Sequence, residues 1–295
     1  MPFRLPVTVN NSGVERGTPA SIGLGAGRVE TIGMTPKSSN GRSIVGMLFR
    51  VDAEITQATA TPFNVGQLFG GMRIVKGGNS NVRMAIDGYD QLVRLFNSLT
   101  RLTDAATDYF NNPDNAGAVG TTSQTMTFFL PLEYRTDDVI PQTVLAFNPV
   151  SAVGATSGNV TCTISYYYSD NTVRDDVINV VTTPTPLNSN TNIDVSTFFA
   201  GSTVQDEVWM DSGADANLNH QTFRMGNTPV FPEVGEFALR AHTNPAVVTQ
   251  KIDGFFLMKA PVTAFPANGV DGQKPILDVN FATTVTPTFY LYSKL

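Results

Sequence analysis

Residues 159–168 read Asn-Val-Thr-Cys-Thr-Ile-Ser-Tyr-Tyr-Tyr, an aromatic-rich strand that ends a long run of short β-type segments. A second such run ends in residues 286–292, Thr-Pro-Thr-Phe-Tyr-Leu-Tyr. Alternating β-branched and aromatic residues are typical of strands that are buried on one face. Two modules of similar size, each closed by such a strand, predict a tandem β-sandwich. They indicate a chain that is built into a larger structure and does not turn over a substrate.

Length and composition agree with two β-modules. A chain of 295 residues is long enough for about two domains, each with its own core. Charged residues make up 15% of the chain, against about 25% in a typical soluble protein. Much of the surface must therefore consist of Thr, Ser, Asn and Gly, which suits a protein whose flanks are buried against neighbours.

The charge balance argues against a nucleic-acid-binding protein. The net charge is -6 and no basic run occurs, whereas phosphate binding requires a concentrated excess of Lys and Arg. Cys162 is the single cysteine, which excludes an intrachain disulfide framework and a multi-cysteine metal site. Because Cys162 lies in the middle of a predicted strand, we expect an inert, packed thiol.

Targeting signals are not expected. No stretch approaches the roughly 18 apolar residues that a transmembrane helix needs, and the first residues lack the apolar core of a signal peptide. These features predict a chain that is made and used in a cytoplasm. The glycosylation sequons at Asn10 and Asn159 are then not expected to carry sugar.

The first half of the chain contains several predicted strands. Residues 1–20 are rich in Pro, Asn, Ser and Gly and predict an extended arm. Residues 44–55 predict a half-buried strand with Phe49, Val51, Ala53 and Ile55 on the buried face. Further strands are predicted at 71–75, 82–86, 127–134 and 143–147, with Pro131 marking an edge, a bulge or a bend.

One amphipathic helix is predicted from Asp90 onward. Its apolar residues recur at spacings of three and four and form one stripe, which consists of Leu92, Leu95, Phe96, Leu99 and Leu102. We expect this helix to pack across the end of its own barrel. The alternative is a helix that binds a partner.

The second half continues as β-structure beyond a boundary at residues 182–190, although the first module can already end near Asp170. The expected organisation is an arm at 1–20, a first domain at 21–170 and a second at 171–295. In the second domain the predicted strands lie at 193–199, 207–210, 237–241, 252–258, 276–281 and 289–292. The Pro- and Gly-rich segments 226–232 and 261–272 are expected to be loops.

No catalytic arrangement is evident. A nucleophile needs a base within hydrogen-bond reach, and the two histidines, His220 and His242, belong to no catalytic or metal-binding spacing. We expect loop or structural roles for both. The glycines at 23–27 and 70–71 match neither a phosphate-binding loop nor a dinucleotide fingerprint and predict bulges and turns.

Carboxylates offer the remaining candidates for chemistry. They cluster at Asp137/Asp138, Asp175/Asp176 and Asp206/Glu207, with Asp211 and Asp215 following. Residues 211–219 do not match an EF-hand calcium loop, so solvated acidic loops are expected. Catalysis by Asp206, Glu207 or Asp211 together with an acid of the other module stays open. The sequence therefore assigns no catalytic, cofactor-binding or metal-binding residue.

Three segments carry a family resemblance. They are the strand, turn and Leu-rich helix of residues 81–99, the segment Phe-Phe-Leu-Pro-Leu at 128–132, and Ile140-Pro141 before residues 144–147. Over about residues 40–170 the chain resembles the double jelly-roll major capsid proteins of tailless, membrane-containing icosahedral bacteriophages, the corticovirus and tectivirus type and the adenovirus hexon lineage. The second half matches only in size and strand pattern.

The resemblance implies an all-β fold of two tandem eight-stranded jelly-roll β-barrels with one short amphipathic helix in the first. It implies homotrimers that imitate six-sided tiles and cover an icosahedral shell over an internal membrane. The implied partners are further copies of the chain in the trimer and in neighbouring capsomers, minor capsid or penton proteins and the lipid of the internal membrane, without direct nucleic-acid contact. The implied location is the virion, assembled in the host cytoplasm.

Two other functions remain open from the sequence. The chain can be a two-domain β-sandwich adhesin, or a carbohydrate-binding spike or fibre protein, in which loop aromatics and acidic residues bind sugar. It can also be a single-jelly-roll capsid protein with an outer domain after Asp170. Uniform trimers and near-hexagonal tiles favour a shell protein, whereas saturable glycan binding favours an adhesin.

Overall fold

The structure is a computed structural model that describes residues 13–37, 41–77, 81–100, 110–183, 186–188, 191–194, 207–235, 253–259 and 275–295. The expectations for Asn10, Leu102, Asp206, His242 and the loop at 261–272 lie outside these residues, as does the strand predicted at 237–241. The described residues form two compact units. The chain passes from the first unit to the second between Asp175 and Asp176.

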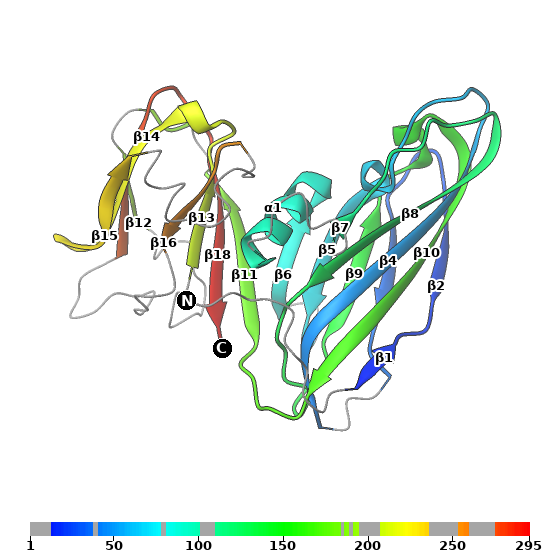
Figure 1. The fold of residues 1–295 in the computed structure, drawn as a ribbon, viewed down its shortest axis with the longest axis horizontal. Coiled ribbons are helices and arrows are strands. Elements are labelled where there is room, and N and C mark those ends of the chain that lie inside the picture. The colour runs from blue at the N-terminus through cyan, green and yellow to red at the C-terminus, as the bar shows by residue number, and fades with distance from the viewer. Residues whose placement is uncertain are drawn as a thin grey trace. The chain divides into compact units, whose positions relative to one another are not determined.

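The first unit contains two antiparallel sheets (Figure 1). One has the order β1-β10-β4-β8-β7, and β2 also pairs with β10. Its strands are β1 (Val14–Arg16), β2 (Ala20–Leu24), β4 (Ser43–Gln57), β7 (Phe110–Asn111), β8 (Gly120–Leu130) and β10 (Ala155–Ser169). The other has the order β6-β5-β9-β3, with β3 (Glu30–Met34), β5 (Phe69–Val75), β6 (Val82–Asp87) and β9 (Gln142–Phe147).

Alternation of side chains along these strands makes the core of the first unit. On β4, Phe49, Val51, Ala53 and Ile55 are buried as predicted, while Arg50 and Glu54 are exposed. The aromatic rings continue this core from strand to strand. Phe128 of β8 stacks on Phe49 with ring centroids 4.5 Å apart, and Phe69 of β5 meets Phe128 edge-on at 6.3 Å. The last contact joins one sheet to the other.

The second unit is built in the same way. One sheet has the order β16-β13-β18-β11, with β11 (Asp176–Thr182), β13 (Glu207–Asp211), β16 (Phe255–Lys259) and β18 (Thr288–Lys294). The other has the order β12-β17-β14-β15, with β12 (Thr191–Asp194), β14 (Leu218–Met225), β15 (Thr228–Gly235) and β17 (Pro275–Phe281). Trp209 stacks on Phe255 at 5.1 Å, and Phe255 meets Tyr290 edge-on at 5.4 Å.

The two units share one topology. If β1 and β7 are set aside as short additional strands, the described residues of each unit form eight strands in chain order. In both units the first strand lies beside the eighth, the eighth beside the third and the third beside the sixth, while the facing sheet has the order second, seventh, fourth, fifth. This is the jelly-roll arrangement of two four-stranded sheets. The predicted all-β fold of two tandem jelly rolls is therefore confirmed.

The predicted helix is also confirmed, as α1 (Gly88–Thr100), which begins two residues before Asp90. Gly88 has a φ of 77°, and its left-handed conformation lets the chain turn from β6 into the helix. The described residues of the apolar stripe, Leu92, Leu95, Phe96 and Leu99, are buried, and α1 packs against β5, β6 and β8 of its own unit. Among the described residues, no helix has the length and apolarity needed to cross a bilayer.

Three segments differ from the sequence-based expectation. Residues 14–16, expected in the arm, form β1 and pair with Tyr167, Tyr166 and Ser165 of β10. Glu15 holds this strand, because its carboxylate accepts hydrogen bonds from the Lys37 backbone N–H (2.8 Å) and the Tyr168 hydroxyl (3.2 Å). The strand predicted to start at residue 127 is β8, which begins at Gly120.

The third difference lies in the second unit, where part of the loop expected at 226–232 is strand β15. Proline lacks a backbone N–H and is tolerated in a strand that has a neighbour on one side only. Among the described strands of its sheet, β15 is the outermost and pairs with β14, so Pro229 and Pro232 are compatible with it.

Candidate functional site

The single cysteine and one of the two histidines lie in strands. Cys162 is buried in β10, and burial, with a smaller contribution from the charge of Asp52, raises the pKa of its thiol to about 12. Such a thiol is not a nucleophile at neutral pH, which agrees with the expected inert cysteine. His220 lies in β14. Within the described ranges, no group of three His, Cys, Asp or Glu side chains is placed to hold a metal ion.

In the acidic segment of the second unit, the side chains form hydrogen bonds with neighbouring residues of the same segment. Glu207 is buried in β13, and its carboxylate accepts a hydrogen bond from the Trp209 indole at 2.9 Å. Asp211 accepts from the backbone N–H of Gly213 at 2.9 Å, and the Asn217 side chain donates to the Ser212 carbonyl at 2.7 Å. These bonds are typical of a turn that is closed by its own side chains.

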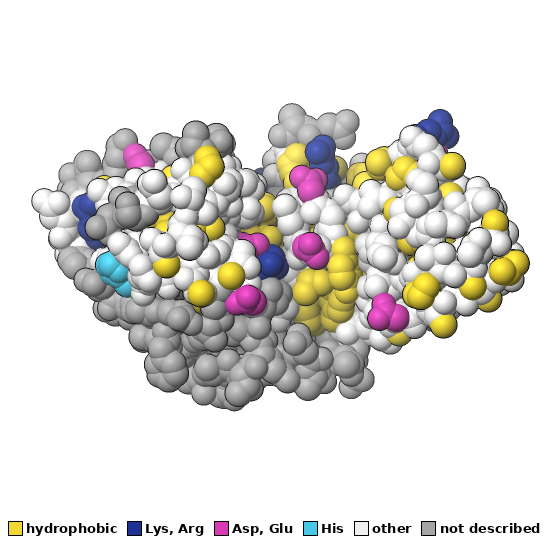
Figure 2. All heavy atoms as spheres, turned by 90° about the horizontal axis from the view of Figure 1, so that it is seen from above, with side chains coloured by type: hydrophobic (Ala, Val, Ile, Leu, Met, Phe, Trp, Pro, Cys, Tyr) yellow, Lys and Arg dark blue, Asp and Glu magenta, His cyan; other side chains and the backbone are white. Residues whose placement is uncertain are grey.

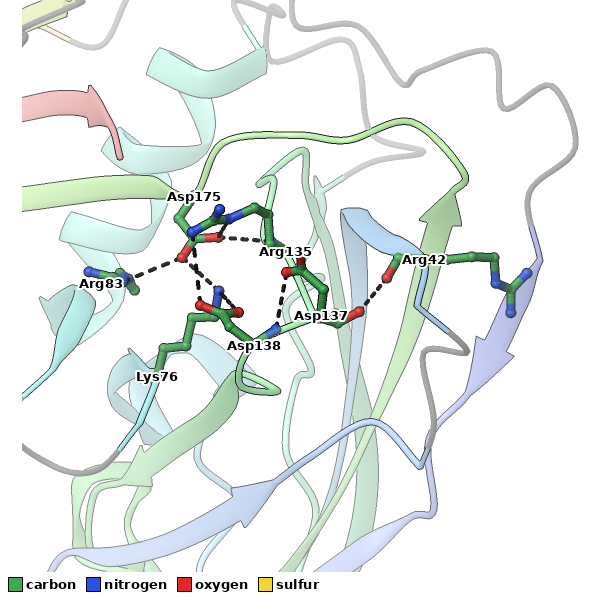
Figure 3. A network of polar contacts seen from close by, with 8 residues as sticks. Arg42, Lys76, Arg83, Arg135, Asp137, Asp138 and Asp175 are labelled. Carbon is green, nitrogen blue, oxygen red and sulfur yellow. Dashed lines mark hydrogen bonds and ion pairs between the residues drawn. The ribbon is translucent and has the colours of Figure 1, made fainter.

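The most concentrated polar site of the described chain is a cluster of five charged side chains in the first unit (Figure 3). We call it the Lys76 cluster, and it consists of Lys76, Arg83, Arg135, Asp138 and Asp175. Lys76 directly follows β5, Arg83 lies in β6, Arg135 and Asp138 lie between β8 and β9, and Asp175 lies between β10 and β11. Residues from four separate parts of the chain thus meet at one point.

Lys76 is at the centre of the cluster. Its Nζ atom lies 2.8 Å from Oδ2 of Asp175 and 2.7 Å from Oδ1 of Asp138. The side chain of Lys76 is 1% exposed and that of Asp175 is 0% exposed, whereas the side chain of Asp138 is 48% exposed. Lys76 therefore joins a fully buried carboxylate to one at the surface.

The other contacts converge on Asp175. The backbone N–H of Arg135 donates to its Oδ1 at 2.8 Å, and Arg83 Nη2 lies 3.4 Å from its Oδ2. The Arg135 guanidinium is more distant, with Nε 4.0 Å from Asp175 and Nη2 3.9 Å from Asp138. Both oxygens of the buried carboxylate thus have donors, as a buried charge requires.

The charges within the cluster favour the ionised form of Asp138. Burial alone works to raise the pKa of its carboxyl group. The hydrogen bond and charge of Lys76 and the backbone N–H of Val139 outweigh that effect, so that the pKa lies at about 2. Asp138 is therefore a carboxylate at any physiological pH and can accept a hydrogen bond from Lys76.

The expectation that the acidic pairs are solvated loops is wrong for Asp175, Asp176 and Glu207, which are all buried. Each carboxylate has a donor that compensates for its loss of hydration: Lys76 for Asp175, Lys294 at 3.3 Å for Asp176 and Trp209 for Glu207. The Lys76 cluster was not predicted because Lys76 falls between the strands predicted at 71–75 and 82–86, where an exposed lysine is the ordinary expectation.

The Lys76 cluster fixes the point at which the chain leaves the first jelly roll. Asp175 is the last residue of that unit. Its contacts hold the segment after β10 to the end of β5, to β6 and to the connection between β8 and β9. A loss of one charged partner would leave another charge buried without compensation, which is more costly than the loss of an exposed ion pair.

Comparisons with solved structures show the same fold in three viral proteins. The STIV (Sulfolobus Turreted Icosahedral Virus) MCP is 12% identical, with a TM-score of 0.65 over 97% of this chain and 96% of that chain. The PBCV-1 virus capsid protein is 11% identical, with a TM-score of 0.61 over 98% and 95%. The major capsid protein P2 from bacteriophage PM2 is 8% identical, with a TM-score of 0.53 over 93% and 96%.

These likenesses extend over nearly the whole of each chain, so both jelly rolls and their order are shared. The predicted resemblance to double jelly-roll capsid proteins is confirmed at the level of fold. No protein-family model and no curated protein sequence matches this chain.

Proposed function

We propose that this chain is the structural major capsid protein of a tailless, membrane-containing icosahedral virus. The observation that carries the proposal is the repetition of one eight-strand topology in two consecutive units. Solved structures with this arrangement over almost their whole length are described as major capsid proteins or as a virus capsid. The role is mechanical and needs no catalytic centre or cofactor.

We infer that three chains associate into a capsomer. Two similar barrels per chain give six barrels per trimer, so that a threefold particle can occupy a six-sided place in a shell. Closed cyclic association also buries the flanks of each subunit. In this proposal the first roll ends at Asp175, close to the boundary expected near Asp170. The residues before β1 serve as the arm.

The composition of the surface supports extensive contacts between copies. In the view of Figure 2, uncharged side chains and backbone cover most of the described surface, and charged groups occupy few places on it. This agrees with a charged fraction of 15%. Protein interfaces are depleted in charged residues at their centres, so a surface of this kind loses little hydration energy when it is covered. Neighbouring capsomers, minor capsid or penton proteins and an internal membrane are the further proposed partners, in the virion.

The proposal predicts that the purified full-length protein forms a homotrimer. Light scattering coupled to gel filtration should give three times the mass of the chain, and negative-stain images of assembled particles should show near-hexagonal tiles. Association through uncharged contacts should depend little on salt. A stable monomer at high concentration, together with saturable binding on a glycan array, would instead favour an adhesin and would contradict the capsid proposal.

A further inference from the structure

The Lys76 cluster contains a buried primary amine in contact with a buried carboxyl group. We propose that Nζ of Lys76 and Cγ of Asp175 become joined by an intramolecular isopeptide bond after the first jelly roll has folded. Asp138 is the proton carrier of the reaction, and the backbone N–H of Arg135 stabilises its intermediate. The inference is carried by contacts within the first unit and does not depend on what the chain assembles into.

The positions of the reacting groups satisfy the first requirement, which is proximity. Nζ lies 2.8 Å from Oδ2 of Asp175, and both side chains are almost completely buried. An amine held against a carboxyl group in a fixed geometry reacts as if its partner were present at a very high concentration. Folding therefore supplies the encounter that free lysine and aspartate in water do not have.

The second requirement is a donor for the oxygen that gains charge. The Arg135 backbone N–H donates to Oδ1 of Asp175 at 2.8 Å. When Nζ adds to Cγ, Oδ1 becomes the oxyanion, and this N–H already points at it. Arg83 Nη2 lies 3.4 Å from Oδ2, the oxygen that departs, where a cation assists its loss. The two oxygens of Asp175 thus have different partners.

The third requirement is a group that moves protons. Asp138 Oδ1 lies 2.7 Å from Nζ and belongs to neither new bond. One ammonium proton passes directly to Oδ2 of Asp175, 2.8 Å away, which frees the nitrogen lone pair and makes the Asp175 carboxyl group neutral. Nζ then adds to Cγ, and an electron pair of the Cγ–Oδ1 double bond moves to Oδ1. Asp138 takes a second proton from the nitrogen and passes it to Oδ2. The Cγ–Oδ2 bond breaks with its electron pair on the oxygen, so that one water departs and the amide keeps the third proton.

Asp175 is the electrophile and Asp138 the carrier because their surroundings differ. Asp175 is 0% exposed, so water has little access to reverse the reaction, while Asp138 is 48% exposed. The bond also replaces a buried ammonium and a buried carboxylate by one neutral amide, which removes the desolvation cost of two charges. Each molecule reacts once, so that even a slow step is completed during the lifetime of the folded protein.

The bond would connect residues that are 99 positions apart in the sequence. It would close a covalent loop from the end of β5 to the segment that follows β10. Such a cross-link restricts the unfolded chain in the way a disulfide does, without requiring an oxidising compartment.

Mass spectrometry of the denatured full-length protein tests the proposal directly. We expect the intact mass to be one water below the value for the sequence, and proteolysis to yield one branched peptide that joins Lys76 to Asp175. In Asp175→Asn the same bond forms with loss of ammonia, so this variant should be lighter by one ammonia. Lys76→Arg keeps the positive charge, has no amine that can form the bond, and should show its full mass.

The control variants identify the chemistry. If the mass of Lys76→Arg were also one water below the value for its sequence, the proposal would be overturned. Such a result would show that the water is lost elsewhere, for example in a succinimide at an aspartate. Full mass in the incubated wild-type protein, with Lys76 and Asp175 recovered in separate peptides, would overturn it as well. Asp138→Asn should slow bond formation by about 10²–10⁴-fold, the usual contribution of a general acid–base group. An unchanged rate would contradict the role of Asp138.

Discussion

Replacement of Lys76 by methionine is expected to lower the free energy of unfolding of the first unit by about 3–5 kcal/mol, because it removes the nearest cation of a buried carboxylate. Asp175 has no exposed surface through which water could replace the ammonium group. In protein that carries the proposed bond, the substitution also removes the covalent loop, so the loss is at least as large. Hydrogen exchange resolved by peptide measures the effect in β4 and β10.

Two variants show whether the uncompensated charge is the cause. Lys76→Met combined with Asp175→Asn should recover part of the loss, because asparagine has no charge and its oxygen can still accept the Arg135 N–H. Arg50→Ala removes an exposed ion pair with Asp52 on β4, in which the side chains are 57% and 36% exposed, and should cost no more than about 1 kcal/mol. A Lys76→Met effect as small as that of Arg50→Ala would contradict this explanation.

The single tryptophan helps to assign such effects. Trp209 lies in β13 of the second unit, so its fluorescence follows that unit. A substitution in the Lys76 cluster that changes exchange in β10 and also shifts the Trp209 transition would indicate that the two units unfold together. A change in hydrogen exchange of the first unit that leaves the Trp209 transition unchanged would indicate that the two units unfold independently.

Much of the fold could be predicted because its signals are local. The alternation in β4 and the run of aromatic residues in β10 and β18 mark strands without knowledge of their neighbours. The stripe of α1 marks a helix in the same way. β1 and β15 were not predicted because their strand conformation depends on pairing with β10 and β14. The residues of β1 include few β-formers, and those of β15 include two prolines.

The Lys76 cluster could not be predicted because its members are distant in the sequence. The β5–β6 hairpin brings Arg83 near Lys76, but Asp175 follows β10, the last strand of the first unit, and lies near them only in the folded unit. Asp137/Asp138 and Asp175/Asp176 stand out in the sequence as acidic pairs, but nothing in their neighbourhood along the chain assigns a cation to either pair. Burial of a lysine in a turn is a property of the folded unit.

Leu95→Ala is expected to destabilise the first unit by about 2–5 kcal/mol, the usual cost of a cavity at a buried leucine. Leu95 is 0% exposed on α1, a helix that packs against β5, β6 and β8. On the same helix, Phe96 lies 5.1 Å from the ring of Phe110, so the stripe also holds β7. Thermal unfolding followed by circular dichroism should show the loss as a lower melting temperature.

Val93→Ala is the matched control for this substitution, because Val93 lies on the same helix and is only partly buried. It should lower the melting temperature less than Leu95→Ala does, since less apolar surface is lost from the core. Trimer formation should persist in both variants at temperatures where they are folded. If Leu95→Ala kept the wild-type melting temperature but prevented assembly, α1 would contribute to a contact between subunits, and its burial within the barrel would not be its main role.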